Sequence, residues 1–146
     1  MDELMRLVLA AAGTLGFGLI FNINKRYLPA AAAGGFIAWF SYVVSRELIE
    51  SMFMQALISG FIIAVYAEIL ARLYKAPSTI FFVVSVIPLV PGKPLYECMN
   101  ALAENNWILA KSKGLETLIF AVGIAGGMGI AWCLCDLQRK LKAAAK

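Results

Sequence analysis

Five apolar stretches, separated by short polar connections, make up most of this chain of 146 residues. A transmembrane helix needs about 20 predominantly apolar residues. Four of the stretches lie at about residues 4–21, 27–44, 51–73 and 115–134, and another begins at about residue 78. Only 15% of the residues are charged, whereas soluble domains average about 25%. We therefore predict an all-α polytopic membrane bundle of about five transmembrane helices, forming a single domain over residues 1–146.

The fourth stretch is unusual because its apolar run, which starts at Ile80, ends in three prolines and a glycine. A proline lacks the N–H that would bond the carbonyl four residues earlier in a helix. Pro88, Pro91 and Pro94 would therefore release the carbonyls of Val84, Ile87 and Val90. Inside a membrane, free carbonyls are tolerated only where they meet protein, water or a ligand. The sequence thus predicts a proline-broken fourth helix.

A broken helix of this kind suggests a binding site. The second half would begin near Lys93, with Pro94 at its first position, and its N-terminal end carries a partial positive charge. Broken helices hold substrate carboxylates in this way in some transporters. The candidate substrate-binding residues here are Pro88, Pro91, Gly92, Lys93 and Tyr96. Alternatively, residues 76–92 simply cross a thin membrane and leave it at Pro91, without forming a site.

Glu68 is the only acidic residue deep inside an apolar stretch. Carboxylates within a membrane are costly and usually face the protein interior or an aqueous path. Glu68 is therefore a second binding candidate, which would carry a proton or bind a substrate amine. Its spacing also permits a simpler role, an ion pair with Arg72 one helical turn later.

The last apolar stretch is rich in glycine. Gly123 and Gly127 lie four residues apart, which gives a smooth face where another helix can approach closely. The helix-packing candidates in this stretch are Gly123, Gly126, Gly127 and Gly129. Before it, residues 95–110 form an amphipathic segment, and we expect Lys111, Lys113 and Gly114 to form the intervening turn.

The positions of lysine and arginine predict the orientation, because these residues favour the cytoplasmic side. With five crossings, one side receives eight of the 13 basic residues, including the C-terminal tail. The other side receives Arg6, Arg46, Lys93, Lys111 and Lys113. This places the N-terminus outside and the C-terminus in the cytoplasm. With only four crossings the counts would be seven and six, and the rule would decide nothing.

Several classes of function have no support in the sequence. The chain has no histidine, which is the commonest general base and metal ligand. It carries no nucleotide-binding motif, and its basic residues lie between apolar runs instead of forming a nucleic-acid surface. We therefore expect no enzyme activity, no cofactor, no metal and no nucleic-acid partner.

Two motifs resemble those of a known transporter family. The first is Gly16-Phe17-Gly18-Leu19-Ile20-Phe21-Asn22, followed by Arg26. The second is Ala76-Pro77, followed by Ile87-Pro88-Leu89-Val90-Pro91-Gly92 and Tyr96. Together they resemble the small subunit of the split threonine/serine exporter family, which is similar to the C-terminal membrane half of single-chain exporters. Asn22, at the end of the first motif, is thereby also a substrate-binding candidate.

The resemblance implies a bacterial inner-membrane protein that works beside a larger membrane subunit and exports small hydroxy amino acids. Some split members are associated instead with small dicarboxylates, so the substrate class stays open between the two. A proton gradient is the expected driving force. Apart from lipid, substrate and the larger subunit, another copy of the chain is also an expected partner. The alternative function is a membrane scaffold that stabilises a larger transporter subunit without transporting anything itself.

Overall fold

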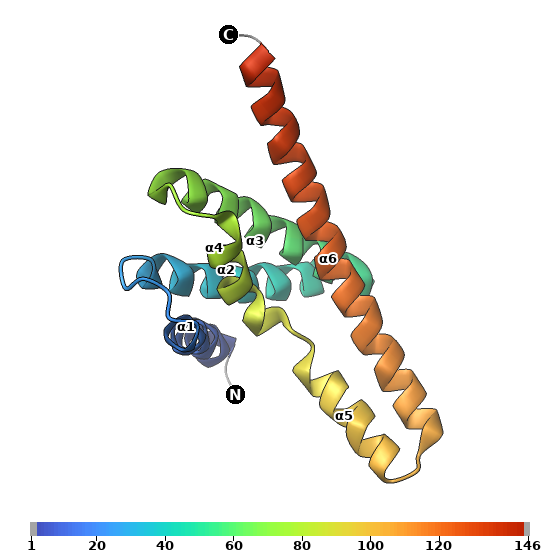
Figure 1. Ribbon diagram of the computed structural model, residues 1–146. Coiled ribbons are helices and arrows are strands. Elements are labelled where there is room, and N and C mark those ends of the chain that lie inside the picture. Colours follow the sequence, from blue (N-terminus) through green and yellow to red (C-terminus); the bar gives the residue numbers. More distant parts are fainter. Residues whose placement is uncertain (1–2, 145–146) are drawn as a thin grey trace.

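The computed structural model describes residues 3–144, and these are helical almost throughout (Figure 1). The helices are α1 (Glu3–Ile20), α2 (Leu28–Leu48), α3 (Met52–Tyr74), α4 (Ser78–Val86), the short 3-10 helix η1 (Ile87–Leu89), α5 (Gly92–Ala103) and α6 (Trp107–Ala144). The described residues contain no strand. The predicted all-α fold is therefore confirmed.

Helix α3 lies at the centre of the packing, with α2, α4 and α6 around it. Most of its inward-facing residues are small, including Ala56, Ala64 and Ala67, which are fully buried. Small side chains let neighbouring helices approach closely in a membrane, where dispersion contacts replace the hydrophobic effect as the main attraction. On the α4 side the core is filled instead by the buried ring of Phe81, which packs edge-on against Tyr27.

Residues with left-handed backbone angles follow the ends of α1, α3 and α5. Asn22, Lys75 and Asn105 have φ values of 52°, 53° and 57°. After α3, the N–H of Ala76 bonds the carbonyl of Ala71 at 3.1 Å, and Pro77 then prevents the helix from continuing. Left-handed residues of this kind commonly end helices, and asparagine tolerates the conformation better than most residues.

The predicted turn at Lys111, Lys113 and Gly114 is wrong, because these residues lie inside α6. The turn occurs earlier, where Asn105 is left-handed and the side chain of Asn106 accepts a hydrogen bond from the N–H of Leu109 at 3.2 Å. A single glycine costs only about 1 kcal/mol in a helix relative to alanine. Gly114 is therefore not enough to interrupt α6.

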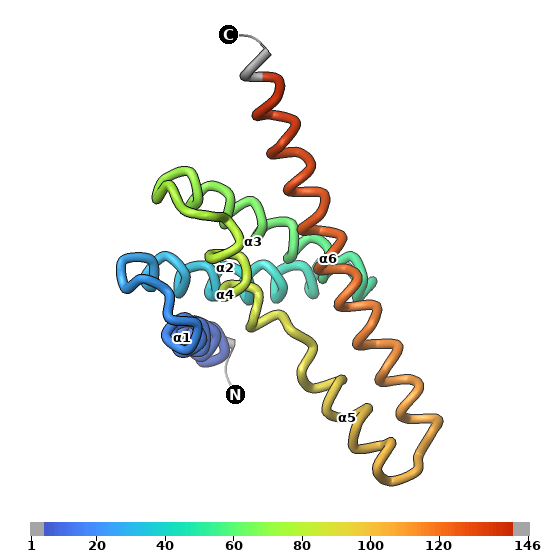
Figure 2. The backbone as a smooth tube through the Cα atoms, viewed as in Figure 1, coloured from blue at the N-terminus to red at the C-terminus, as the bar shows by residue number. Residues whose placement is uncertain are grey.

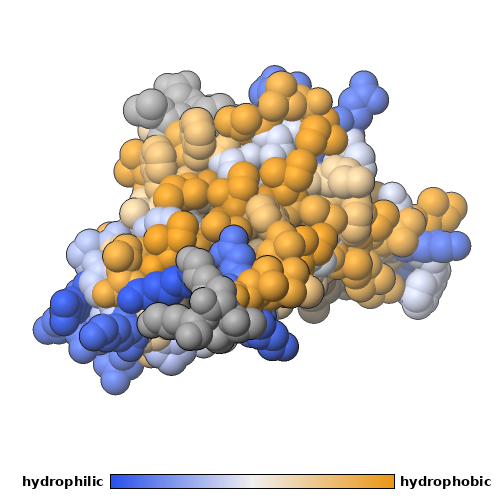
Figure 3. Space-filling view, turned by 90° about the horizontal axis from the view of Figure 1, so that it is seen from above, coloured by the Kyte–Doolittle hydropathy of each residue, from blue (hydrophilic) through white to orange (hydrophobic). Residues whose placement is uncertain are grey.

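Three helices are long and apolar enough to cross a membrane, namely α2, α3 and α6. The segments Ser78–Leu89 and Gly92–Ala103 meet the same criterion only as a pair, bent by 58°. The apolar part of α1, Met5–Ile20, is shorter. Apolar residues also cover much of the face shown in Figure 3, with hydrophilic residues at its margins. These features are those of a helical membrane bundle. The described residues provide three candidate spans, or up to four if the bent pair forms one, whereas the sequence predicted about five.

Helix α5 turns back into α6 and forms an antiparallel hairpin with its first half, which projects from the rest of the bundle (Figure 2). The second half of α6 packs tightly against α3. A Cβ atom at Gly127 would lie 2.1 Å from the carbonyl oxygen of Leu57, and one at Gly123 would lie 2.8 Å from that of Phe53. The structure thus places both glycines where α6 crosses α3, whereas Gly126 has only a loose neighbour and Gly129 has open space around it.

We predict that Gly127→Ala destabilises the chain while Gly129→Ala does not. Both substitutions favour the helix by about 1 kcal/mol, but only the first places a methyl group against the α3 backbone, where overpacking costs about 1–3 kcal/mol. The thermal unfolding midpoints of the two variants in detergent measure the difference. Equal midpoints would show that α3 and α6 do not approach as closely as described.

Candidate substrate-binding site

The break between α4 and α5 consists of two consecutive tight turns. The N–H of Val90 bonds the carbonyl of Ile87 at 3.0 Å, which closes η1. Pro91 has φ −75° and ψ 62°, the angles of an inverse γ-turn, and the N–H of Gly92 accordingly bonds the carbonyl of Val90 at 2.7 Å. Helix α5 begins at Gly92, so the bend falls on the proline–glycine motif.

These turns correct part of the sequence-based prediction. The carbonyls of Ile87 and Val90 were expected to be free, because Pro91 and Pro94 cannot donate to them. Instead, each accepts a backbone hydrogen bond from a nearer residue, Ile87 from Val90 and Val90 from Gly92. A carbonyl oxygen has two lone pairs, so each keeps one further acceptor position. The break therefore satisfies the backbone locally and still presents polar atoms.

A cavity of about 390 Å³ lies against this break. Basic side chains from three helices line it: Arg6 of α1, Arg46 of α2 and Lys93 of α5. The described residues that line it include no acidic one; the remainder are Trp39, Tyr42, Pro88, Leu89, Val90, Pro91, Gly92, Pro94 and Phe120. An adjoining cavity of about 510 Å³ shares Arg6, Trp39, Pro88 and Lys93 with it. Outside the lining, Glu47 lies 3.7 Å from Arg46 and Glu97 lies 3.8 Å from Lys93, so part of this positive charge is offset nearby. The two cavities are large enough for a small metabolite.

Trp39 is one of the aromatic residues that line this cavity. Its ring packs against Tyr42, with 5.6 Å between the ring centroids. The indole Nε1 is buried and has no hydrogen-bond acceptor among the described residues. A buried donor without an acceptor costs about 1–3 kcal/mol. The three cations that line the cavity make it suited to a negatively charged oxygen ligand.

The cavity contains most, but not all, of the residues that the sequence singled out at the break. Pro88, Pro91, Gly92 and Lys93 line it. Tyr96 is 70% exposed and is not among the lining residues. Asn22 lies in the turn between α1 and α2 and lines none of the cavities described in this section.

Sequence reasoning missed Arg6, Arg46 and Trp39 as site residues. A usable signal was present, because the charge rule assigns Arg6, Arg46 and Lys93 to the same side of the membrane. Arg6 lies in the first turns of α1 and Arg46 in the last turn of α2. Helix ends on one side can meet, but the crossing angles that bring them to one cavity depend on tertiary packing.

Glu68 lies in a different place. Its side chain is only 7% exposed, and it bonds Arg139 of α6 and lies 3.6 Å from Arg72. It lines a cavity of about 270 Å³ beside Ser78 and Thr79, at the start of α4. The nine residues of α4, about 13 Å of helix, separate Ser78 from the proline break. Glu68 and Gly92 therefore do not share a cavity, and the alternative pairing of Glu68 with Arg72 is present.

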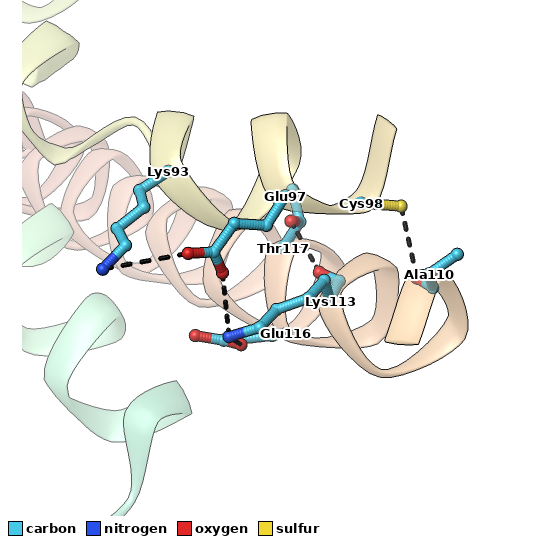
Figure 4. Close-up of polar contacts among 7 residues, drawn as sticks. All are labelled: Lys93, Glu97, Cys98, Ala110, Lys113, Glu116 and Thr117. Carbon is cyan, nitrogen blue, oxygen red and sulfur yellow. Dashed lines mark hydrogen bonds and ion pairs between the residues drawn. The ribbon is translucent and has the colours of Figure 1, made fainter. Parts of the chain in front are cut away.

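A row of charges joins α5 to α6 beside the break (Figure 4). Glu97 lies 3.8 Å from Lys93 and 3.0 Å from Lys113, and Lys113 also lies 3.1 Å from Glu116. The thiol of Cys98 donates to the carbonyl of Ala110 at 3.2 Å. These contacts hold the hairpin together and connect the cavity residue Lys93 to a chain of alternating charges.

With this geometry established, one comparison identifies the family. The family model described as "Threonine/Serine exporter, ThrE" matches residues 6–133, which is most of the chain. The chain belongs to the threonine/serine exporter family. No solved structure matches it. The resemblance drawn from the two motifs is thus confirmed, and the chain is a multi-pass membrane protein of a transporter family, not of an enzyme family.

The Glu68–Arg139 contact leads to a prediction about this exporter-family chain. We expect Arg139→Gln to lower the free energy of unfolding by about 1–3 kcal/mol, less than the about 3–5 kcal/mol typical of a fully buried pair. The effect is smaller because Arg72 remains beside Glu68 and the Arg139 side chain is 59% exposed.

The matched control is Lys140→Gln, since Lys140 pairs with Asp136 on the surface of the same helix. Surface pairs contribute about 0–1 kcal/mol. Unfolding of both variants in detergent, followed by circular dichroism, provides the comparison. An Arg139 variant as stable as the Lys140 variant would contradict a structural role for the pair.

Proposed function

We propose that this chain is the small membrane subunit of a secondary exporter for threonine, serine or similar small carboxylates, working beside a larger membrane subunit and driven by the proton gradient. It would lie in the inner membrane of a bacterium, with its N-terminus outside and its C-terminus in the cytoplasm. The family match supports the transporter class. The finer claims rest on the cavity at the proline break and on the distribution of charge.

The observation that supports the proposal most directly is the convergence of Arg6, Arg46 and Lys93 on one cavity. Two opposite charges about 4 Å apart attract by about 1 kcal/mol in water and by about 4 kcal/mol at an effective dielectric constant of 20. A carboxylate in this cavity would gain an attraction between these two values from each cation, nearer the lower value at Lys93, whose side chain is 86% exposed. The N-terminal end of α5 would add donors.

The same cavity can accommodate the rest of a small amino acid. The ammonium group needs acceptors, and the carbonyl of Val90, a residue that lines the cavity, has a second lone pair of this type. Aromatic rings of Trp39, Tyr42 and Phe120 would enclose the carbon atoms. A small dicarboxylate would instead use the additional cations for its second carboxylate. Threonine, serine and succinate are therefore the ligands to compare.

We predict that Lys93→Gln and Arg46→Gln each lower efflux from vesicles containing both subunits by about tenfold. Loss of one charged hydrogen bond weakens binding by about 1.5–3 kcal/mol, and 1.4 kcal/mol corresponds to tenfold. Lys25→Gln is the matched control, because Lys25 lies in the α1–α2 turn and does not line the cavity.

The same experiment separates transport from the scaffold alternative. A scaffold would need only to assemble with the larger subunit. Unchanged efflux in both cavity variants, with the complex recovered intact, would therefore contradict a binding role for the cavity and favour the scaffold.

Glu68 is the proposed proton carrier, because it is a buried carboxylate beside the start of α4. We predict that Glu68→Gln lowers efflux and flattens its dependence on pH, since an amide cannot exchange a proton with the gradient. Arg139→Gln is the structural comparison. If Glu68 only forms ion pairs, both variants should reduce efflux to a similar extent and keep the wild-type shape of the pH profile.

A further inference from the structure

Helix α5 carries a continuous polar stripe along one side. The stripe consists of Lys93, Glu97, Asn100 and Glu104, spaced four, three and four residues apart, which is the spacing of one helical face. Two contacts run along it, between Lys93 and Glu97 at 3.8 Å and between Asn100 and Glu104 at 2.9 Å. Leu95 and Leu102 lie on the opposite side of the helix and are exposed.

The stripe begins at the proposed binding cavity. Lys93 lines that cavity and the adjoining one. From Lys93 to Glu104 the helix rises by about 16 Å, and Glu104 lies at the end of α5, next to the turn that leads into α6. Lys113 and Glu116 widen the polar surface from the α6 side, because Lys113 binds Glu97. Polar groups thus run without interruption from the cavity to the end of the hairpin.

This surface does not fit contact with lipid. The segments Ser78–Leu89 and Gly92–Ala103 meet the criterion for a span, by length and composition, only as a bent pair. If this pair forms one span, the stripe lies within the membrane. Charged residues there face the interior of the protein or a water-filled cavity. The Lys93 side chain is 86% exposed in this chain. Water or a polar partner surface must therefore lie against the stripe, while Leu95 and Leu102 on the other side suit lipid.

We propose that the polar stripe of α5 is one wall of a water-filled path between the cavity at the break and the membrane surface that carries the α5–α6 turn. The inference rests on the proposed function, for which it supplies the release path. In the proposed orientation this turn lies outside the cell, as an exporter requires. The two lysines of this polar surface, Lys93 and Lys113, are offset by the glutamates beside them. A carboxylate would therefore be held only weakly along the path, which lets the ligand leave.

Cysteine accessibility tests this path. In a chain whose three native cysteines are replaced by alanine, Asn100→Cys lies on the stripe and Leu102→Cys on the opposite side. The complex with the larger subunit is exposed to a charged, membrane-impermeant methanethiosulfonate reagent. We expect Asn100→Cys to react at least tenfold faster than Leu102→Cys, its reaction to be slowed by saturating threonine or succinate, and its modification to abolish efflux.

Three outcomes would overturn the proposal. Equal reactivity at the two positions would show that the polar stripe faces no separate aqueous space. Fast modification of Asn100→Cys that neither ligand slows would show that the stripe lies on the membrane surface and not along the ligand path. Modification that leaves efflux intact would show the same. Glu104→Cys and Leu95→Cys repeat the comparison if either of the first pair fails to assemble.

The result is distinguishable from failure of the proposed cavity. If Lys93→Gln left efflux unchanged while modification of Asn100→Cys still blocked it and ligand still slowed the labelling, the path would stand and the cavity would not bind the ligand. If Lys93→Gln reduced efflux but Asn100→Cys stayed unreactive, the cavity would stand and the path would be wrong.

Discussion

The structure depends first on the absence of an N–H group in proline. Pro88 and Pro91 follow the apolar helix α4 and end it. The backbone there forms a 3-10 turn and then an inverse γ-turn within a few residues. Local turns satisfy the carbonyls, which a membrane requires, but they cannot keep the helix axis straight. η1 packs against α1 and α2, and the bend of 58° between the two segments turns the start of α5 so that it faces those helices across the basic cavity.

The crossing of α3 and α6 stabilises the arrangement of helices around this bend. Gly123 and Gly127 allow the two backbones to approach to distances that no side chain would permit, and the Glu68–Arg139 contact ties the same two helices together beside the start of α4. At the other end, Glu97 and Lys113 fasten α5 to α6. Helix α6 is therefore fixed on α3 and in turn fixes the direction of α5, which forms one side of the cavity.

The sequence predicted those features that depend on a few neighbouring residues. Proline chemistry located the break, and four-residue glycine spacing located a packing face, because both effects act over about one helical turn. It misplaced the turn before α6, since the left-handed tolerance of Asn105 outweighed the weak helix-breaking tendency of Gly114. Of the two partners of Glu68, the sequence predicted Arg72, which is one helical turn away. It missed Arg139, which is 71 residues distant and comes close only through the α3–α6 crossing. The cavity residues Arg6, Arg46 and Trp39 depended in the same way on how α1 and α2 cross.

The central claim is that the cavity at the proline break binds the carboxylate of the transported molecule. The most direct test is fluorine NMR of the chain, labelled with fluorotryptophan and assembled with its larger subunit. The chain has three tryptophans, and Trp→Phe variants assign their signals. Trp39 lines the basic cavity, Trp132 lines the cavity at Glu68, and Trp107 is 67% exposed. Titration with threonine or succinate should shift the Trp39 signal saturably and leave that of Trp107 unchanged. A saturable shift of Trp132 alone, or no shift at all under conditions of active efflux, would contradict the account.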